Sequence, residues 1–177
     1  MKQKFIFLLA IFGTFILSGC IKNDPVTIGS DKYVEFDATV LNTPITGQVY
    51  PVLTRVPAYG ASVVAANPSI SRTSGAVKFR VNLVGAQQAT DQTINYRVVA
   101  SPVLPAGVNP AVAGTHYNTG TSFVIPANSS FGEITINVLN PGVSSTTPVG
   151  LVVELLGNDL VKPSQNYKFL GVQINEQ

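Results

Sequence analysis

Alternation of apolar and polar residues with a period of two is the feature that most constrains this fold. Successive side chains of a β-strand point to opposite faces, so this alternation indicates a strand with one buried face. It is clearest in residues 77–83, 94–98, 134–138 and 151–155, and weaker in residues 33–37, 48–54, 122–125 and 167–174. No window after residue 20 shows the sustained apolar stripe of an amphipathic helix. The pattern predicts an all-β domain.

Turn-forming residues separate these segments and set the expected architecture. Gly, Pro and Asn gather at Gly85 and in residues 102–107, 118–120, 126–128, 140–142 and 157–159. Seven or eight short strands separated by such turns predict an immunoglobulin-like antiparallel β-sandwich, with a small barrel as the alternative. Residues 57–71 are the least regular part, and we expect a loop or an edge strand there.

The first 19 residues have the three parts of an export signal. Lys2 and Lys4 form a positive start, residues 5–16 are an unbroken apolar run, and residues 17–19 end in small side chains. The apolar run is shorter than the roughly 20 residues that span a bilayer as a helix, so a permanent transmembrane anchor is disfavoured. We expect residues 1–19 to be a cleaved signal peptide.

Cys20 is the only cysteine, so no intramolecular disulfide can form. The run Leu17-Ser18-Gly19-Cys20 resembles the bacterial lipobox. The resemblance implies that a signal peptidase recognises Leu17, Ser18 and Gly19, and that lipidated Cys20 becomes the new N-terminus. Two or three acyl chains would hold the protein firmly to a membrane. The alternative is a free thiol beside an ordinary cleavage site, where it would be prone to oxidation.

Residues 20–31 lack periodicity and are expected to be a lipidated, flexible tether, followed by a single sandwich domain over residues 32–177. Ten extended residues reach roughly 33 Å, enough to hold a domain clear of lipid headgroups. Lys22-Asn23-Asp24 loosely resembles the polar segment after the cysteine in surface-exported lipoproteins of Bacteroidota. That resemblance implies a cell-envelope protein on the exposed side of the outer membrane.

The charge balance argues against a nucleic-acid partner. The whole chain has 11 basic and 9 acidic residues, and loss of Lys2 and Lys4 would leave nine of each. No basic patch or charge run remains to bind phosphates. Charged residues make up 11% of the chain, against roughly 25% in typical soluble domains. This composition suits an extracellular module whose surface is carried by Ser, Thr, Asn and Gln.

The sequence around His116 has the most specific local pattern. Residues 113–117 (AGTHY), 123–130 (FVIPANSS) and 133–138 (EITINV) resemble the turn and strands of a Calx-beta domain, and the likeness extends over about 75–174. The same pattern is similar to Calx-beta-like domains of unknown function in Bacteroidota surface lipoproteins. The resemblance implies a β-sandwich and is nearly silent on function. Because His116 replaces the family's Asp, we expect no calcium at this turn. A calcium cluster of Asp91, Glu133 and Asp159 is the alternative.

Few residues could support catalysis. His116 is the only histidine, so a Ser-His-Asp triad would have to use it. We expect instead a turn residue with a packed or hydrogen-bonded ring. Glu35 and Asp37 share a strand face and could flank a cation or act as a carboxylate pair. We expect instead that this face of the strand is exposed to solvent. The sequence therefore predicts no catalytic residue, no metal site, no cofactor and no enzymatic activity.

Aromatic residues in predicted loops are the remaining candidates for ligand contacts. Exposed rings can stack on sugars, and Tyr50, Tyr59 and Tyr117 lie in or near loops. We expect Tyr33, Tyr96 and Tyr167 to point into the sandwich or flank it. The function expected from the sequence is a non-enzymatic, membrane-anchored surface module that binds or displays a glycan or a neighbouring envelope protein. The alternatives are a structural accessory subunit of an outer-membrane complex and a β-sandwich hydrolase.

Overall fold

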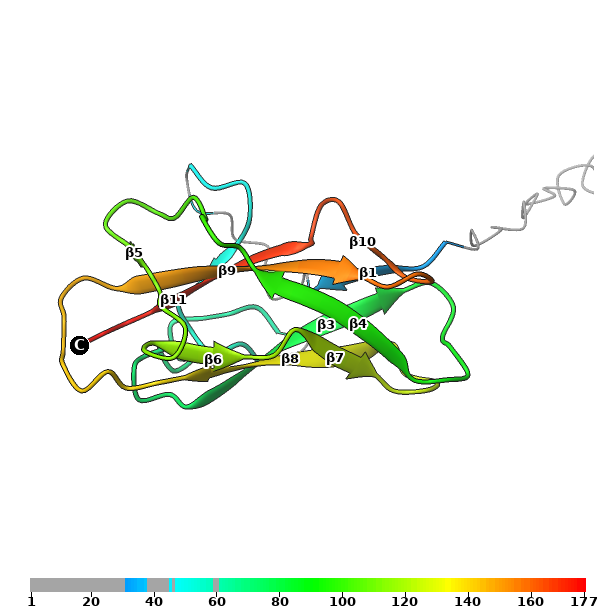
Figure 1. Cartoon of the computed structure of the whole chain (residues 1–177), viewed down its shortest axis with the longest axis horizontal. Helices are drawn as coiled ribbons and strands as arrows, with labels where there is room; N and C mark the ends of the chain where they lie inside the picture. Colours follow the sequence, from blue (N-terminus) through cyan, green and yellow to red (C-terminus); the bar gives the residue numbers. More distant parts are fainter. Residues whose placement is uncertain (1–30, 38–44, 46, 59–60) are drawn as a thin grey trace, which may run out of the picture.

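The computed structural model describes residues 31–37, 45, 47–58 and 61–177. The predicted signal peptide, the lipidation site Cys20, most of the tether and Tyr59 lie outside these residues. The described part contains eleven strands and no helix, and none of its segments is a helix that could cross a membrane. The long strands follow the long axis of the domain (Figure 1).

The strands form two sheets. The first sheet has the order β10 (Lys162–Pro163), β1 (Tyr33–Phe36), β3 (Ala76–Val84), β8 (Phe131–Val138), β6 (Tyr117–Thr119). The second has the order β2 (Val52–Leu53), β11 (Phe169–Ile174), β9 (Val149–Gly157), β4 (Gln92–Val98), β7 (Ser122–Ile125), with β5 (Asn109–Pro110) paired to β9. The predicted immunoglobulin-like sandwich is thus confirmed, and the barrel alternative is wrong.

Each predicted strand segment contains an observed strand, although β2 keeps only two residues of the predicted 48–54. Three strands of two or three residues, β5, β6 and β10, were not expected. The long strands pair antiparallel, as predicted, but β1–β10, β2–β11 and β5–β9 are parallel. The sheets are therefore mixed, because these short strands come from loops and pair with strands that do not adjoin them in a hairpin.

The core lies between the sheets and follows the predicted alternation. In β3 the side chains of Val77, Phe79, Val81 and Leu83 are buried, while the residues between them face outward. The face of the second sheet that is turned toward β3 contributes Ile94, Leu151, Leu155, Leu170 and Ile174 to the same core. Burying one such side chain completely stabilises a fold by roughly 1.5–3 kcal/mol. With no disulfide among the described residues, these two apolar faces hold the sandwich together.

The outer face of the second sheet is covered as well. A Cβ built on Gly150 would lie 2.9 Å from Val108 Cγ1, and one on Gly171 would lie 2.9 Å from Tyr50 Cε2. These glycines therefore make room for the segments around Val108 and Tyr50 to pack on β9 and β11. Val152, which points the same way, is fully buried outside the main core cluster.

This packing corrects the expectation for Tyr50. Tyr50 as a whole residue is 8% exposed, and its hydroxyl donates to the carbonyl oxygen of Val103. Burial raises the pKa of the Tyr50 phenol above its usual value. The ring fills the space left by Gly171, so it offers no face to a sugar.

Candidate functional site

The described part of the chain enters the sandwich at one end, and three surface hollows lie at the other. Tyr33 pairs with Val84 at the end of β3, so residues 31–32 enter beside Gly85. β8 and β11 finish at the opposite end, where β3 begins. We call this second end the loop end and define it as residues 99–116, 139–148 and 175–177. In Figure 1 the loop end carries the red C-terminus, and the blue residues 31–36 begin at the other end.

A hollow of about 350 Å³ opens at the loop end. Its wall combines β5, the start of β9 and the connection between β8 and β9, and it is lined by Asn109, Pro110, His116, Pro141, Val143, Ser145, Thr147, Val149 and Glu176. Most of these residues are apolar or uncharged. We call this space the Glu176 hollow, because Glu176 is the one acidic residue among the described residues that line it.

Glu176 has a buried side-chain oxygen without a hydrogen-bond partner in the described part of the chain. The residue is only 2% exposed, and the oxygen without a partner is Oε1. None of the ion pairs among the described residues includes it. Its backbone carbonyl, in contrast, accepts a hydrogen bond from the Ser145 N–H at 2.9 Å. Because an unpaired buried carboxylate costs several kcal/mol, this side chain is the strongest candidate for contact with a ligand.

His116 lines the same hollow from a tight turn. Its Nδ1 accepts a hydrogen bond from the Val112 N–H at 2.9 Å, and its backbone N–H donates to the Val112 carbonyl. The carbonyl of His116 accepts from the Leu139 N–H, which ties this turn to the end of β8. The expected role as a turn residue with a hydrogen-bonded ring is confirmed. With Nδ1 acting as an acceptor, the neutral ring carries its proton on Nε2 and can donate there.

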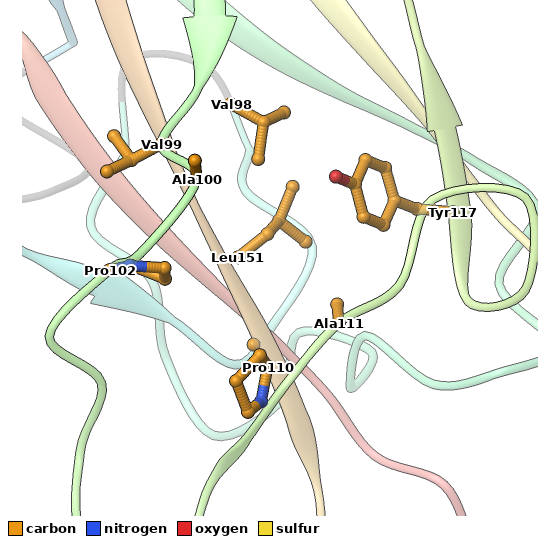
Figure 2. A pocket seen from close by; sticks show the side chains of 9 residues that line it. Val98, Val99, Ala100, Pro102, Pro110, Ala111, Tyr117 and Leu151 are labelled. Atoms are coloured by element: carbon orange, nitrogen blue, oxygen red, sulfur yellow. The ribbon is translucent and has the colours of Figure 1, made fainter.

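A second, smaller hollow of about 150 Å³ shares Pro110 with the Glu176 hollow. Figure 2 shows the Tyr117 hydroxyl pointing into the space bordered by Val98 and Leu151. The Tyr117 residue is 6% exposed, and burial raises the pKa of its phenol. Tyr117 thus presents its hydroxyl to a small hollow and hides the ring face that a stacked sugar would need. The expectation of an exposed ring is wrong here too, because Tyr117 is part of the core.

A third hollow, of about 270 Å³, flanks the same connection between β8 and β9. Thr146 and Pro148 line it, whereas Ser145 and Thr147 line the Glu176 hollow. Alternate residues of this segment therefore border different hollows. The third hollow also holds Arg55, whose Nη1 donates to the Asn67 carbonyl at 2.6 Å.

The other acidic candidates do not meet at a site. Asp91 Oδ1 accepts from the Ala127 N–H at 2.8 Å, and Glu133 pairs with Lys78 at 2.9 Å. Within the described part of the chain, no group of three or more His, Cys, Asp or Glu side chains is placed to hold a metal ion.

Glu35 and Asp37 depart from the expected solvated strand face. Asp37 is buried and Glu35 is half-buried, so the face that they share is largely covered. Neither residue lines any of the three hollows described above.

Sequence reasoning missed Glu176, although the signal was present. Val172 and Ile174 are buried at alternate positions of β11, and the same period places Glu176 on their side of the chain. A carboxylate at the next position of a series of alternating buried residues is expected to be buried as well. A buried charge needs a partner.

No protein-family model and no curated protein matches this chain. Among solved structures, a two-domain protein of unknown function from Bacteroides fragilis is similar, with a TM-score of 0.50, 10% identity and coverage of 82% of this chain and 45% of that one. The apo-form Calx CBD1 domain has a TM-score of 0.46 at 18% identity, covering 61% of this chain and 88% of that one. A CBD12 structure from CALX1.2 has a TM-score of 0.46 at 17% identity, covering 60% of this chain and 40% of that one. At such identities the similarity concerns the fold alone.

Proposed function

We propose that this protein is a non-enzymatic, lipid-anchored surface module that binds a neighbouring envelope protein at its loop end. The observation that carries the proposal is the placement of the hollows and of residues 31–32 at opposite ends of the sandwich. β3 has nine residues and so spans about 30 Å. An anchor at Cys20 would thus attach at the end opposite these hollows, which favours an orientation with the loop end pointing away from the lipid.

A protein partner is favoured over a glycan because of the buried tyrosines. Tyr50 and Tyr117 are in the core, and the described part of the Glu176 hollow has no aromatic lining residue. Sugar recognition without an aromatic platform would have to rely on hydrogen bonds alone. Assembly through a sheet edge has less support, because β2, β6, β7 and β10 at the edges have two to four residues each. Short edge strands discourage strand addition.

The anchor is tested by metabolic labelling with an alkynyl fatty acid. The wild-type protein should incorporate the label and sediment with membranes, and Cys20→Ala should do neither. Equal labelling of both proteins would contradict lipidation at Cys20.

The orientation is tested with two single-cysteine sites, Val143→Cys at the loop end and Leu160→Cys at the opposite end. Both side chains are exposed, at 74% and 64%, and a lipidated Cys20 leaves each new cysteine as the only free thiol. A fluorophore at position 160 should be quenched more strongly by a headgroup-linked quencher than one at position 143. Equal or reversed quenching would contradict the proposed orientation.

A further inference from the structure

We infer that the Glu176 hollow receives the ammonium group of a lysine side chain from the protein partner. The inference rests on the proposed function, because it names the chemistry by which the loop end would recognise that partner. It is carried by the buried Glu176 carboxylate together with the apolar wall around it.

The charge of the hollow selects a cation. Glu176 is almost completely buried, and its Oε1 has no hydrogen-bond partner in the described structure. A bound ammonium would supply both a counter-charge and hydrogen-bond donors, and charge-assisted hydrogen bonds are about twice as strong as neutral ones. An anionic group would meet the same carboxylate with repulsion.

The shape of the hollow suits an aliphatic stem. Pro110, Pro141, Val143 and Val149 form the apolar part of the wall. Long cationic side chains pack their methylene groups on apolar surfaces and keep the charged end on a polar group. The volume of about 350 Å³ lies at the lower end of the roughly 300–1,000 Å³ that ligand pockets occupy.

A metal ion fits this hollow less well. Calcium takes six to eight oxygen ligands, several of them from carboxylates. Glu176 is the only carboxylate that lines the hollow, and no three-residue acidic or histidine cluster exists among the described residues.

Arg72 is a basic residue that contacts the chain next to Glu176. Its backbone N–H donates to the Asn175 carbonyl, and its Nη1 donates to Asn140 Oδ1 at 3.3 Å. Arg72 does not form an ion pair with Glu176 and does not line the hollow. Among the described residues, the Glu176 carboxylate therefore has no cationic partner.

The inference is tested by amide NMR on the full mature protein in detergent micelles, with Nα-acetyl-lysine methylamide as the probe. The matched neutral probe is Nα,Nε-diacetyl-lysine methylamide, which keeps the stem and loses the charge. We expect saturable shifts at Ser145, Thr147 and Glu176 with a Kd on the order of 1 mM. The neutral probe should bind at least tenfold more weakly.

Two variants separate the carboxylate from general effects of charge. Glu176→Gln should weaken binding of the lysine probe at least tenfold, and Asp159→Asn, an exposed site at the opposite end, should leave it unchanged. Should Glu176→Gln fail to fold, Val143→Trp narrows the hollow from an exposed position and should weaken binding at least fivefold.

Three results would overturn the inference: no shifts with the lysine probe, equal binding of the two probes, or shifts at the hollow with calcium alone. If one of them occurs while position 143 still faces away from the lipid, the inference about lysine fails and the proposed function stands. If position 143 lies at the lipid, the proposed function fails whatever the probes do.

Discussion

The backbone carbonyl of Glu176 accepts a hydrogen bond from the Ser145 N–H at 2.9 Å, while the Glu176 side chain lies buried beside the same segment. The last residues of the chain thus fasten the connection between β8 and β9 that forms part of the hollow's wall. The segment is fixed by a backbone contact, and Oε1 of the carboxylate has no hydrogen-bond partner among the described residues. An unsatisfied buried group requires an explanation, and a bound ligand would supply the missing partner.

Glu176→Gln should stabilise the unliganded protein while it removes binding. The substitution takes away a buried, unpaired charge and keeps the shape of the side chain, so we expect the free energy of unfolding to rise by about 1 kcal/mol at pH 7. Urea unfolding measures this change, with Asp159→Asn as the control of equal charge change. A clear loss of stability in Glu176→Gln would mean that the carboxylate has a structural role.

Gly171→Ala should destabilise the outer layer of the second sheet. Its Cβ would lie 2.8 Å from Val52 Cγ2 and 3.3 Å from the Pro51 carbonyl oxygen. Overpacking of this kind costs roughly 1–3 kcal/mol. Gly120→Ala is the matched control, since its closest contact would be 3.4 Å from the Tyr96 hydroxyl oxygen. Equal thermal stability of the two variants would show that residues around Tyr50 do not pack on β11.

The two buried tyrosines should respond differently to loss of the hydroxyl. Tyr50 donates to the Val103 carbonyl, whereas the Tyr117 hydroxyl faces the small hollow. Tyr50→Phe should therefore cost about 1 kcal/mol of stability, and Tyr117→Phe should cost less than half of that. Chemical denaturation of the pair measures the difference, and the opposite order would contradict the Tyr50–Val103 contact.

The same tyrosines should make the fold sensitive to alkali. Burial raises the pKa of both phenols in the folded state above the unfolded value near 10. Their neutral forms are compatible with the fold, so their contribution to stability is complete below pH 10 and falls as the pH rises through the folded-state pKa. Spectrophotometric titration should show phenols that ionise above the unfolded value, and Tyr50→Phe should remove one of them. Ionisation of every tyrosine together at the unfolded value would contradict this burial.

The long strands could be predicted from the sequence because four or more residues display a period of two. The strands β5, β6 and β10 have only two or three residues, which is too few to show any period. Tyr50 was misplaced for a different reason, since its burial depends on Val103, 53 positions away along the chain. The Glu176 hollow likewise requires that residues from β5, the connection between β8 and β9 and the end of β11 meet, which no local pattern reveals.

Binding of a partner at the loop end can be tested in the native envelope by placing a photo-crosslinking amino acid at position 143 or at position 160 of the anchored protein. We expect one dominant adduct with an envelope protein from position 143, strongly reduced by Glu176→Gln, and little or none from position 160. Adducts from position 160 alone, or an adduct at position 143 that Glu176→Gln leaves unchanged, would contradict the claim that the loop end binds a partner through this carboxylate.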